Sequence, residues 1–92
     1  MKPTKWQVLF EKNAQKAFEK LDRPAQIKIR DFLRERLINA ENPRLFGKKL
    51  TGQLSDFWRY RIEDYRIVCK IEDQELIILV VRVAHRRMVY KD

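Results

Sequence analysis

The sequence predicts an α+β fold in which two N-terminal helices pack on one face of a mainly antiparallel sheet. Three observations predict it. A short alternating segment comes first, two stretches with helical spacing of apolar residues follow, and three strand-like segments separated by short turns come last. The expected element order is therefore β-α-α-β-β-β. A chain of 92 residues can bury one hydrophobic core, so residues 1–92 are expected to form one domain.

The first strand and the first helix are expected near the N-terminus. Trp6, Val8 and Phe10 alternate with less apolar neighbours, which is the pattern of a strand with one better-buried face. Asn13 is a suitable N-cap, and the apolar spacing changes there to that of a helix. The Asp-Arg-Pro sequence at 22–24 is expected to end this helix.

A second helix is predicted to follow directly. Pro24 suits a first helical turn, where its missing N–H group would have no partner in any case. Apolar residues then recur every three or four positions and form one stripe: Ala25, Ile29, Phe32, Leu33 and Leu37. Asn42-Pro43 should end the helix. Residues 44–56 hold both glycines and several cations, so they are expected to form a mobile basic connection.

The C-terminal half is predicted to form a three-stranded meander. Residues 57–62 and 65–71 alternate, and residues 75–83 are rich in β-branched side chains. The intervening turns, at 63–64 and 72–74, are short, and such turns join antiparallel strands. The helices must bury their apolar stripes against one face of this sheet, so the other face should remain open.

The charge balance favours a polyanionic or acidic partner. Lysine and arginine number 21 against 13 acidic residues, which gives a net charge of +8 and a pI near 9.9. A lone Cys69 and a single histidine cannot form a disulfide or a Cys/His metal site, so we expect a reduced, cytoplasmic protein without metal or cofactor. The longest apolar run, residues 76–81, is too short to span a membrane.

Much of the positive charge is expected on the open face of the sheet. Arg59 and Arg61 are two positions apart on one strand, so they share a face, and Arg66 and Lys70 share a face of the next strand. More cations lie at or beyond the end of the last strand: Arg82, Arg86 and Arg87. We expect these segments to form one basic, partly aromatic concavity. The alternative is that Arg59 and Arg61 form ordinary ion pairs with carboxylates of the adjoining turns.

Three motifs resemble those of the RelE branch of the RelE/ParE toxin superfamily: Lys49-Leu50-Thr51-Gly52, Asp64-Tyr65-Arg66-Ile67-Val68 and Val83-Ala84-His85-Arg86-Arg87-Met88-Val89-Tyr90. Their order and the β-α-α-β-β-β layout also agree with that family. The resemblance implies that the chain cleaves messenger RNA in the A site of the 70S ribosome. It further implies that an acidic RelB-like antitoxin neutralises the chain, which should be a monomer when alone.

The resemblance also implies roles for single residues. Arg66 and Arg86 match family arginines that look like ligands of the phosphate and of the transition state. Arg59 and Arg61 fall where the best-known members carry two lysines, and Tyr90 falls at the tyrosine that orients or stacks on the substrate. Arginine can brace a phosphate, but it is a poor proton acceptor at neutral pH. The general base must therefore be sought elsewhere.

His85 is the expected general base, because it is the one side chain whose ordinary pKa is near neutrality. The neighbouring cations should keep it in the neutral form that a base requires. The candidate catalytic residues are Arg59, Arg61, Arg66, His85, Arg86 and Tyr90. The candidate RNA-binding residues are Lys48, Lys49, Lys70, Arg82 and Arg87. No metal ligand is expected.

Two other functions are compatible with the same residues. A ParE-like toxin would poison DNA gyrase by binding and would need no proton-transfer residues. A non-catalytic module that binds RNA or the ribosome would need only the basic surface. The presence of Arg86 with Tyr90 argues against the ParE-like toxin. The alternative role for His85 is that of an ordinary surface imidazole, and the alternative for Tyr90 is packing on the core.

Overall fold

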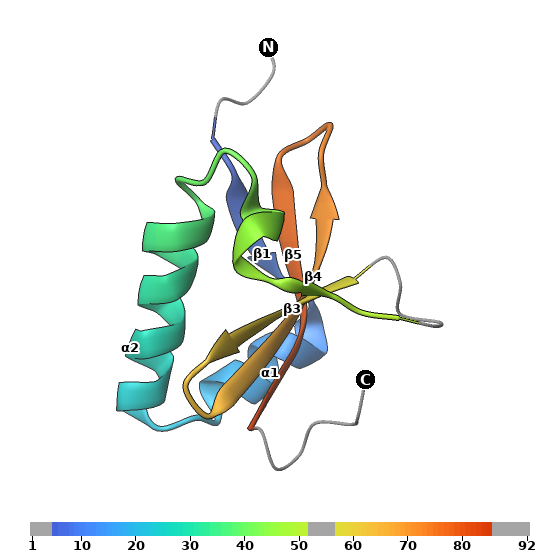
Figure 1. The fold of residues 1–92 in the computed structure, drawn as a ribbon. Coiled ribbons are helices and arrows are strands. Elements are labelled where there is room, and N and C mark those ends of the chain that lie inside the picture. The colour runs from blue at the N-terminus through green and yellow to red at the C-terminus, as the bar shows by residue number, and fades with distance from the viewer. Residues whose placement is uncertain (1–4, 52–56, 86–92) are drawn as a thin grey trace.

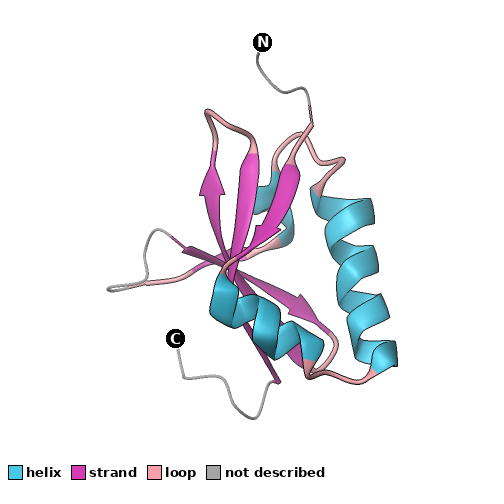
Figure 2. Ribbon diagram, turned by 180° about the vertical axis from the view of Figure 1, so that it is seen from behind, coloured by secondary structure: helices cyan, strands magenta, loops and turns pink. Residues whose placement is uncertain are grey.

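In the computed structural model, which describes residues 5–51 and 57–85, a five-stranded sheet carries both helices on one face (Figure 1). The strand order is β1-β5-β4-β3-β2. The pairs among β2, β3, β4 and β5 are antiparallel, and β1 runs parallel to β5. The predicted α+β class, with N-terminal helices packed on a mainly antiparallel sheet, is confirmed. Figure 2 shows the two helices from the opposite side.

The N-terminal strand β1 (Gln7–Phe10) leads directly into α1 (Lys12–Glu19). Phe10 packs against the core, while Leu9 lies on the other face and is 41% exposed, so the predicted alternation is confirmed. The predicted cap is wrong by two residues. Glu11 is the N-cap, and its carboxylate accepts a hydrogen bond from the Asn13 amide at 2.8 Å. A carboxylate there satisfies a free amide and also suits the helix dipole.

The second helix, α2 (Arg23–Phe32), continues into the π-helical segment η1 (Leu33–Leu37). Asp22 caps it by accepting a hydrogen bond from the Ala25 amide at 3.1 Å, and proline occupies its first turn as predicted. Ile29, Leu33 and Leu37 are buried, which confirms the apolar stripe.

The segment after the helix is ordered where the sequence predicted a mobile connection. Pro43–Phe46 forms a 3-10 turn, η2, and Lys48–Lys49 forms the short edge strand β2, which pairs with β3. The prediction is therefore wrong for residues 44–49. A two-residue strand has no periodicity to detect, and it exists because Tyr60 of β3 fixes the turn that precedes it. Residues 52–56 lie outside the described part of the chain.

The remaining strands form the predicted meander: β3 (Phe57–Ile62), β4 (Tyr65–Glu72) and β5 (Ile77–His85). The register between β4 and β5 is irregular. Val68 lies opposite Arg82, but the next residue, Cys69, lies opposite Val80. Val81 is thus the extra residue of a β-bulge, and the alternation of side chains along β5 changes at this point.

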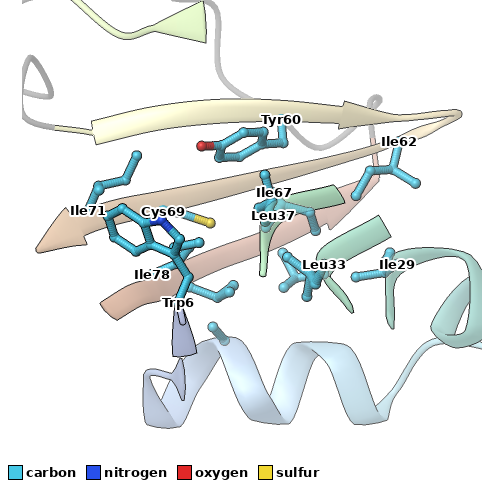
Figure 3. Packing of buried hydrophobic residues seen from close by; sticks show 13 residues of the cluster. Trp6, Ile29, Leu33, Leu37, Tyr60, Ile62, Ile67, Cys69, Ile71 and Ile78 are labelled. Atoms are coloured by element: carbon cyan, nitrogen blue, oxygen red, sulfur yellow. The ribbon is translucent and has the colours of Figure 1, made fainter. Parts of the chain in front are cut away.

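The hydrophobic core lies between the helices and the inner face of the sheet (Figure 3). Tyr60 and Ile67 of neighbouring strands are fully buried and face Leu37. Cys69 is also fully buried, and burial raises the pKa of its thiol. A thiol in this environment fills space and is unreactive. The core thus holds the sheet rigid and leaves its outer face for other contacts.

Candidate nucleic-acid interface

The outer face of the sheet gathers arginines from three adjacent strands, and this set is called the arginine face below: Arg59, Arg61, Arg66 and Arg82. Arg59 of β3 and Arg82 of β5 both lie opposite Val68 of β4, one on each side. Residues opposite each other in antiparallel strands project from the same face, so the two guanidinium groups flank Val68. Val68 is only 3% exposed, as expected where long arginine stems lie beside an apolar side chain.

The second row of this face brings two arginines directly opposite each other. Arg61 of β3 pairs in register with Arg66 of β4. Like charges in such a position destabilise a sheet. Arg66 offsets part of this cost, because its Nη1 donates hydrogen bonds to the carbonyl oxygens of Glu63 and Tyr65, both at 3.0 Å. Its guanidinium is therefore held over the β3–β4 turn, while Arg61 remains exposed.

Arg82 reaches the arginine face because of the bulge at Val81. Ile78 and Val80 are buried against the helices, so a regular strand would direct residue 82 to the same inner side. The extra residue shifts the alternation by one, and Val83 becomes the next buried residue. Arg82 is exposed as a result. The basic character of this face thus depends on a local irregularity of β5.

The candidate lysines divide between the two sides of the sheet. Lys48 lies opposite Arg59 and therefore extends the arginine face onto β2. Lys49 lies opposite Trp58, whose side chain packs against the core, so Lys49 does not share that face. Lys70 is on the outer face, but its Nζ lies 3.4 Å from a carboxylate oxygen of Glu72. Of the three, Lys48 is best placed to act with the arginines.

Two of the three turn carboxylates considered as partners of Arg59 and Arg61, those of Glu63 and Glu72, pair with lysines. Glu63 accepts a hydrogen bond from Lys28 of α2 at 2.9 Å, and this contact raises the pKa of the lysine. Glu72 pairs with Lys70. Both contacts are exposed and add little stability. The ion pairs that Arg61 was expected to form with these glutamates, as the alternative interpretation, are thus absent among the described residues.

The structure does not bring His85 to the arginine face. His85 lies opposite Tyr65, and the two rings meet edge to face with centroids 5.4 Å apart. Tyr65 lies opposite Ile62, a core residue, so this pair belongs to the inner side of the sheet. His85 and Arg82 are three residues apart on one strand, so they project from opposite faces of the sheet. The bulge at Val81 decides which of the two faces outward.

The last predicted site residues, Arg86, Arg87 and Tyr90, follow β5 directly and lie outside the described residues. Within residues 5–51 and 57–85, no group of three or more histidine, cysteine or acidic side chains is arranged to hold a metal ion. The chemistry available on the described outer face is therefore that of fixed positive charge. Guanidinium groups bind phosphate oxygens through directed hydrogen bonds.

The turn that precedes β2 is attached to the core side of the sheet at several points. The buried hydroxyl of Tyr60 donates a hydrogen bond to the carbonyl oxygen of Pro43 at 2.9 Å. Arg44 forms a bidentate ion pair with Asp73, at 2.9 and 2.6 Å, and its guanidinium lies 5.9 Å from the ring centroid of Trp58. The hydrogen bond from Arg44 lowers the pKa of the Asp73 carboxyl. These contacts fix the position of Lys48 beside Arg59.

Comparison with known families identifies the chain. The family described as "ParE toxin of type II toxin-antitoxin system, parDE" matches residues 8–90. This match covers all of the helices and strands described above except the first residue of β1. The chain belongs to this toxin family. The resemblance to the RelE/ParE superfamily is thereby confirmed. No curated protein sequence matches the toxin significantly.

Solved structures agree with the assignment. A chain of the RelBE2 toxin–antitoxin complex from Mycobacterium tuberculosis is 25% identical and superposes with a TM-score of 0.81, over 90% of the toxin and 100% of that chain. The isolated E. coli RelE toxin gives a TM-score of 0.70 at 20% identity, over 95% of the toxin and 87% of RelE. A chain of the RelB–RelE complex from Methanococcus jannaschii gives 0.67 at 26% identity, over 87% and 92%. The toxin is thus similar in fold to RelE toxins.

A second feature of the toxin, which the sequence did not reveal, is an apolar pocket on the helix side. Its volume is about 260 Å³. It is lined by residues of β1, α1 and the α2–η1 helix: Val8, Phe10, Gln15, Phe18, Arg30, Leu33, Arg34 and Ile38. The two arginines are four positions apart and exposed, so they lie on one side of the helix.

No helix in the described parts of the toxin is long and apolar enough to cross a membrane.

Proposed function

We propose that this toxin is an endoribonuclease that cleaves messenger RNA in the A site of the ribosome. The observation that carries the proposal is the arginine face, on which Arg59, Arg61, Arg66 and Arg82 come together from three adjacent strands. Positive charges gathered on one face of a sheet favour the binding of an anion. A phosphodiester backbone supplies such an anion at regular spacing, and an extended strand of RNA fits an open sheet face.

The chemistry suited to this face is phosphate transesterification. The ribose 2′-oxygen attacks the adjacent phosphorus and gives up its proton, and the bond from phosphorus to the 5′-oxygen breaks. The products carry a 2′,3′-cyclic phosphate and a 5′-hydroxyl, which takes up a proton. Negative charge grows on the phosphorane oxygens during this step, and guanidinium groups already in position stabilise it. Arg61 and Arg66 are directly opposite in register and form the proposed phosphate clamp.

We assign His85 no role in proton transfer, because its imidazole lies against Tyr65 on the inner side of the sheet. We further assign Arg86 to binding of phosphate and Tyr90 to stacking on a base of the substrate. Arg87 would add to the binding of RNA. Positioning of the message by the ribosome supplies much of the rate, since orientation alone contributes several kcal/mol. The isolated toxin should therefore be a weak nuclease on free RNA.

We further propose that an acidic antitoxin silences the toxin in the cytoplasm. Two of the solved structures named above are toxin–antitoxin complexes, RelBE2 from Mycobacterium tuberculosis and RelB–RelE from Methanococcus jannaschii. In the described sheet β1 is an edge strand, and the apolar pocket beside it is flanked by Arg30 and Arg34. An amphipathic segment with carboxylates at its margin would match both properties.

Expression of the toxin followed by mapping of messenger RNA 5′ ends tests the proposed activity. Codon-phased cuts are expected with the parent and should fall by at least ten-fold with Arg61→Ala, because a charge-assisted contact to phosphate contributes about 1.5–3 kcal/mol. Arg36→Ala is the matched control, since this exposed arginine lies on η1. Intact messages during growth arrest would contradict the nuclease proposal.

The second candidate is a gyrase poison. The matching family is described by its ParE members, and the described part of the arginine face holds no side chain with an ordinary pKa near neutrality. A binding toxin needs no such group. Covalent complexes of gyrase with cleaved DNA in arrested cells would favour this candidate over the nuclease.

A further inference from the structure

The 3-10 turn η2 presents two large apolar side chains to solvent. Leu45 is 78% exposed and Phe46 is 44% exposed. Adjacent exposed apolar residues on a small basic protein are unfavourable in water, and they commonly mark a contact surface. Neither side chain belongs to the core cluster. The question is which partner they contact.

The backbone that carries these side chains is rigidly held. Tyr60, which is fully buried, binds the carbonyl oxygen of Pro43 at one end of the turn, and the Gly47 amide donates to the carbonyl oxygen of Arg44 at 3.1 Å at the other. The bidentate pair of Arg44 with Asp73 attaches the same turn to the β4–β5 hairpin. An apolar pair held out in this way is prepared for binding, because little conformational entropy remains to be lost.

Phe46 lies next to the cation row because η2 leads directly into β2. Phe46 is the last residue of η2, and Gly47 alone separates it from Lys48, the first residue of β2. A Cβ atom at Gly47 would lie 2.8 Å from the Cε1 atom of Tyr60, so this connection is packed tightly against the core. Lys48 lies opposite Arg59. The exposed ring of Phe46 is therefore two residues from the β2 end of the cation row.

We propose that Phe46 and Lys48 form a base-stacking subsite for single-stranded RNA at the β2 edge of the arginine face. This inference rests on the proposed function and extends it by one nucleotide-binding position. The aromatic ring offers a flat surface for a nucleobase, and Lys48 continues the row of cations that begins at Arg82 and Arg59. Stacking of this kind binds single strands without reading their sequence.

The charge of the segment favours RNA over an apolar protein surface. Residues 42–51 contain Arg44, Lys48 and Lys49 and no acidic residue. An exposed aromatic ring beside cations is suited to binding single-stranded nucleic acid. Leu45 is the more exposed of the two apolar side chains but has no π face, so it provides the natural control.

Binding of a fluorescent 2′-O-methyl oligoribonucleotide to the full chain tests the subsite, because this probe cannot be cleaved by 2′-oxygen attack. Phe46→Leu keeps the apolar character and loses the ring, so its Kd is expected to rise about ten-fold, which is the size of one stacking contact. Phe46→Trp should bind at least as tightly as the parent. Leu45→Ala should change the Kd by less than about two-fold, because it removes no ring.

The outcomes separate the subsite from the wider proposal. If Phe46→Leu binds RNA as well as the parent while Arg61→Ala loses binding, the stacking subsite is wrong and the arginine face stands. If Arg61→Ala also binds normally, the proposed function fails with it. If Phe46→Leu and Phe46→Trp both retain RNA binding and only Leu45→Ala weakens capture by an acidic antitoxin segment, the turn is a protein-docking surface and the inference is overturned. Thermal unfolding of each variant confirms that the fold is intact.

Discussion

The two faces of one sheet perform opposite tasks in this toxin. On the inner face of β4, Ile67 and Cys69 are fully buried against the helices. On its outer face, Arg66 lies directly opposite Arg61, where like charges weaken the sheet. Stability is therefore concentrated on one side and charge on the other. Substitutions on the two faces should separate folding from RNA binding.

Truncation on the inner face should have the largest effect. Ile78→Ala removes a fully buried side chain from the centre of the core, and such a change costs about 2–5 kcal/mol of unfolding free energy. Chemical denaturation measures it. Leu9→Ala on the outer face is the control and should change stability by less than about 0.5 kcal/mol, because Leu9 is already 41% exposed. Equal losses would contradict the assignment of stability to one face.

Removal of charge from the outer face should have the converse effect. The double variant Arg59→Ala/Arg61→Ala is expected to weaken RNA binding about 100-fold, since each charge-assisted hydrogen bond contributes about 1.5–3 kcal/mol. The slope of log Kd against log salt should fall by about 0.7 for each phosphate of a single strand that the variant no longer neutralises. Unfolding free energy should change by less than about 1 kcal/mol, because loss of Arg61 relieves repulsion with Arg66 while loss of the Arg59 stem uncovers Val68. A large drop in stability would show that these arginines are structural.

The contact of Gly47 with Tyr60, which attaches β2 to the core, leaves no space for an added methyl group. Gly47→Ala places a Cβ atom 2.8 Å from a ring carbon of Tyr60 and 3.0 Å from the carbonyl oxygen of Arg59. Such overpacking costs about 1–3 kcal/mol, and it should displace β2. We expect weaker protection of the Leu50 amide, which donates to the Phe57 carbonyl, in hydrogen exchange. Unchanged protection would mean that the turn adapts without moving the strand.

The buried hydroxyl of Tyr60 offers a second, milder test of the attachment of η2 to the core. Tyr60→Phe keeps the ring in the core but leaves the carbonyl oxygen of Pro43 without its donor at 2.9 Å. Pro43 is buried, so its unsatisfied acceptor should cost about 1–3 kcal/mol. Thermal unfolding measures the change. Burial also raises the pKa of this phenol, so the effect should not vary between pH 6 and 8.

The exposed ion pair between Arg44 and Asp73 should have the smallest effect. Its hydrogen bond lowers the folded-state pKa of the Asp73 carboxyl below the ordinary 3.8. The pair therefore stabilises the folded state above that value, and the stabilisation disappears as the pH falls through the lower folded-state pKa. Asp73→Asn should cost less than about 1 kcal/mol at pH 7. The difference from the parent should shrink toward pH 2, and a difference that grew on acidification would contradict this linkage.

The sequence predicted the elements whose side chains repeat with a clear period. The helical stripe through Ile29, Leu33 and Leu37 and the alternation in β3 and β4 required no tertiary information. The strand β2 did require it, because two residues have no period and depend on Tyr60 and Asp73 for their position. The mobile connection predicted there was therefore wrong.

The site was predicted where strand alternation is regular and missed where it is not. Arg59, Arg61 and Arg66 share the expected face. The bulge at Val81 could not be foreseen, since Val80, Val81 and Val83 are chemically alike and any of them could face the core. That one extra residue sends Arg82 outward and His85 inward. Arg82 and His85, both predicted for one site, therefore project from opposite faces of the sheet.

The parallel pairing of β1 with β5 has a consequence for synthesis. Residues 7–10 emerge from the ribosome early, but their partners at 77–80 emerge close to the end. The strand β5, which contains residues 77–80, also supplies Arg82 and lies between β1 and the other strands of the sheet. A nascent chain that stops short of β5 has neither a closed core nor a complete cationic surface. We therefore expect premature termination to yield a fragment that neither folds nor carries the full arginine face, so that the active surface forms only when translation has nearly finished.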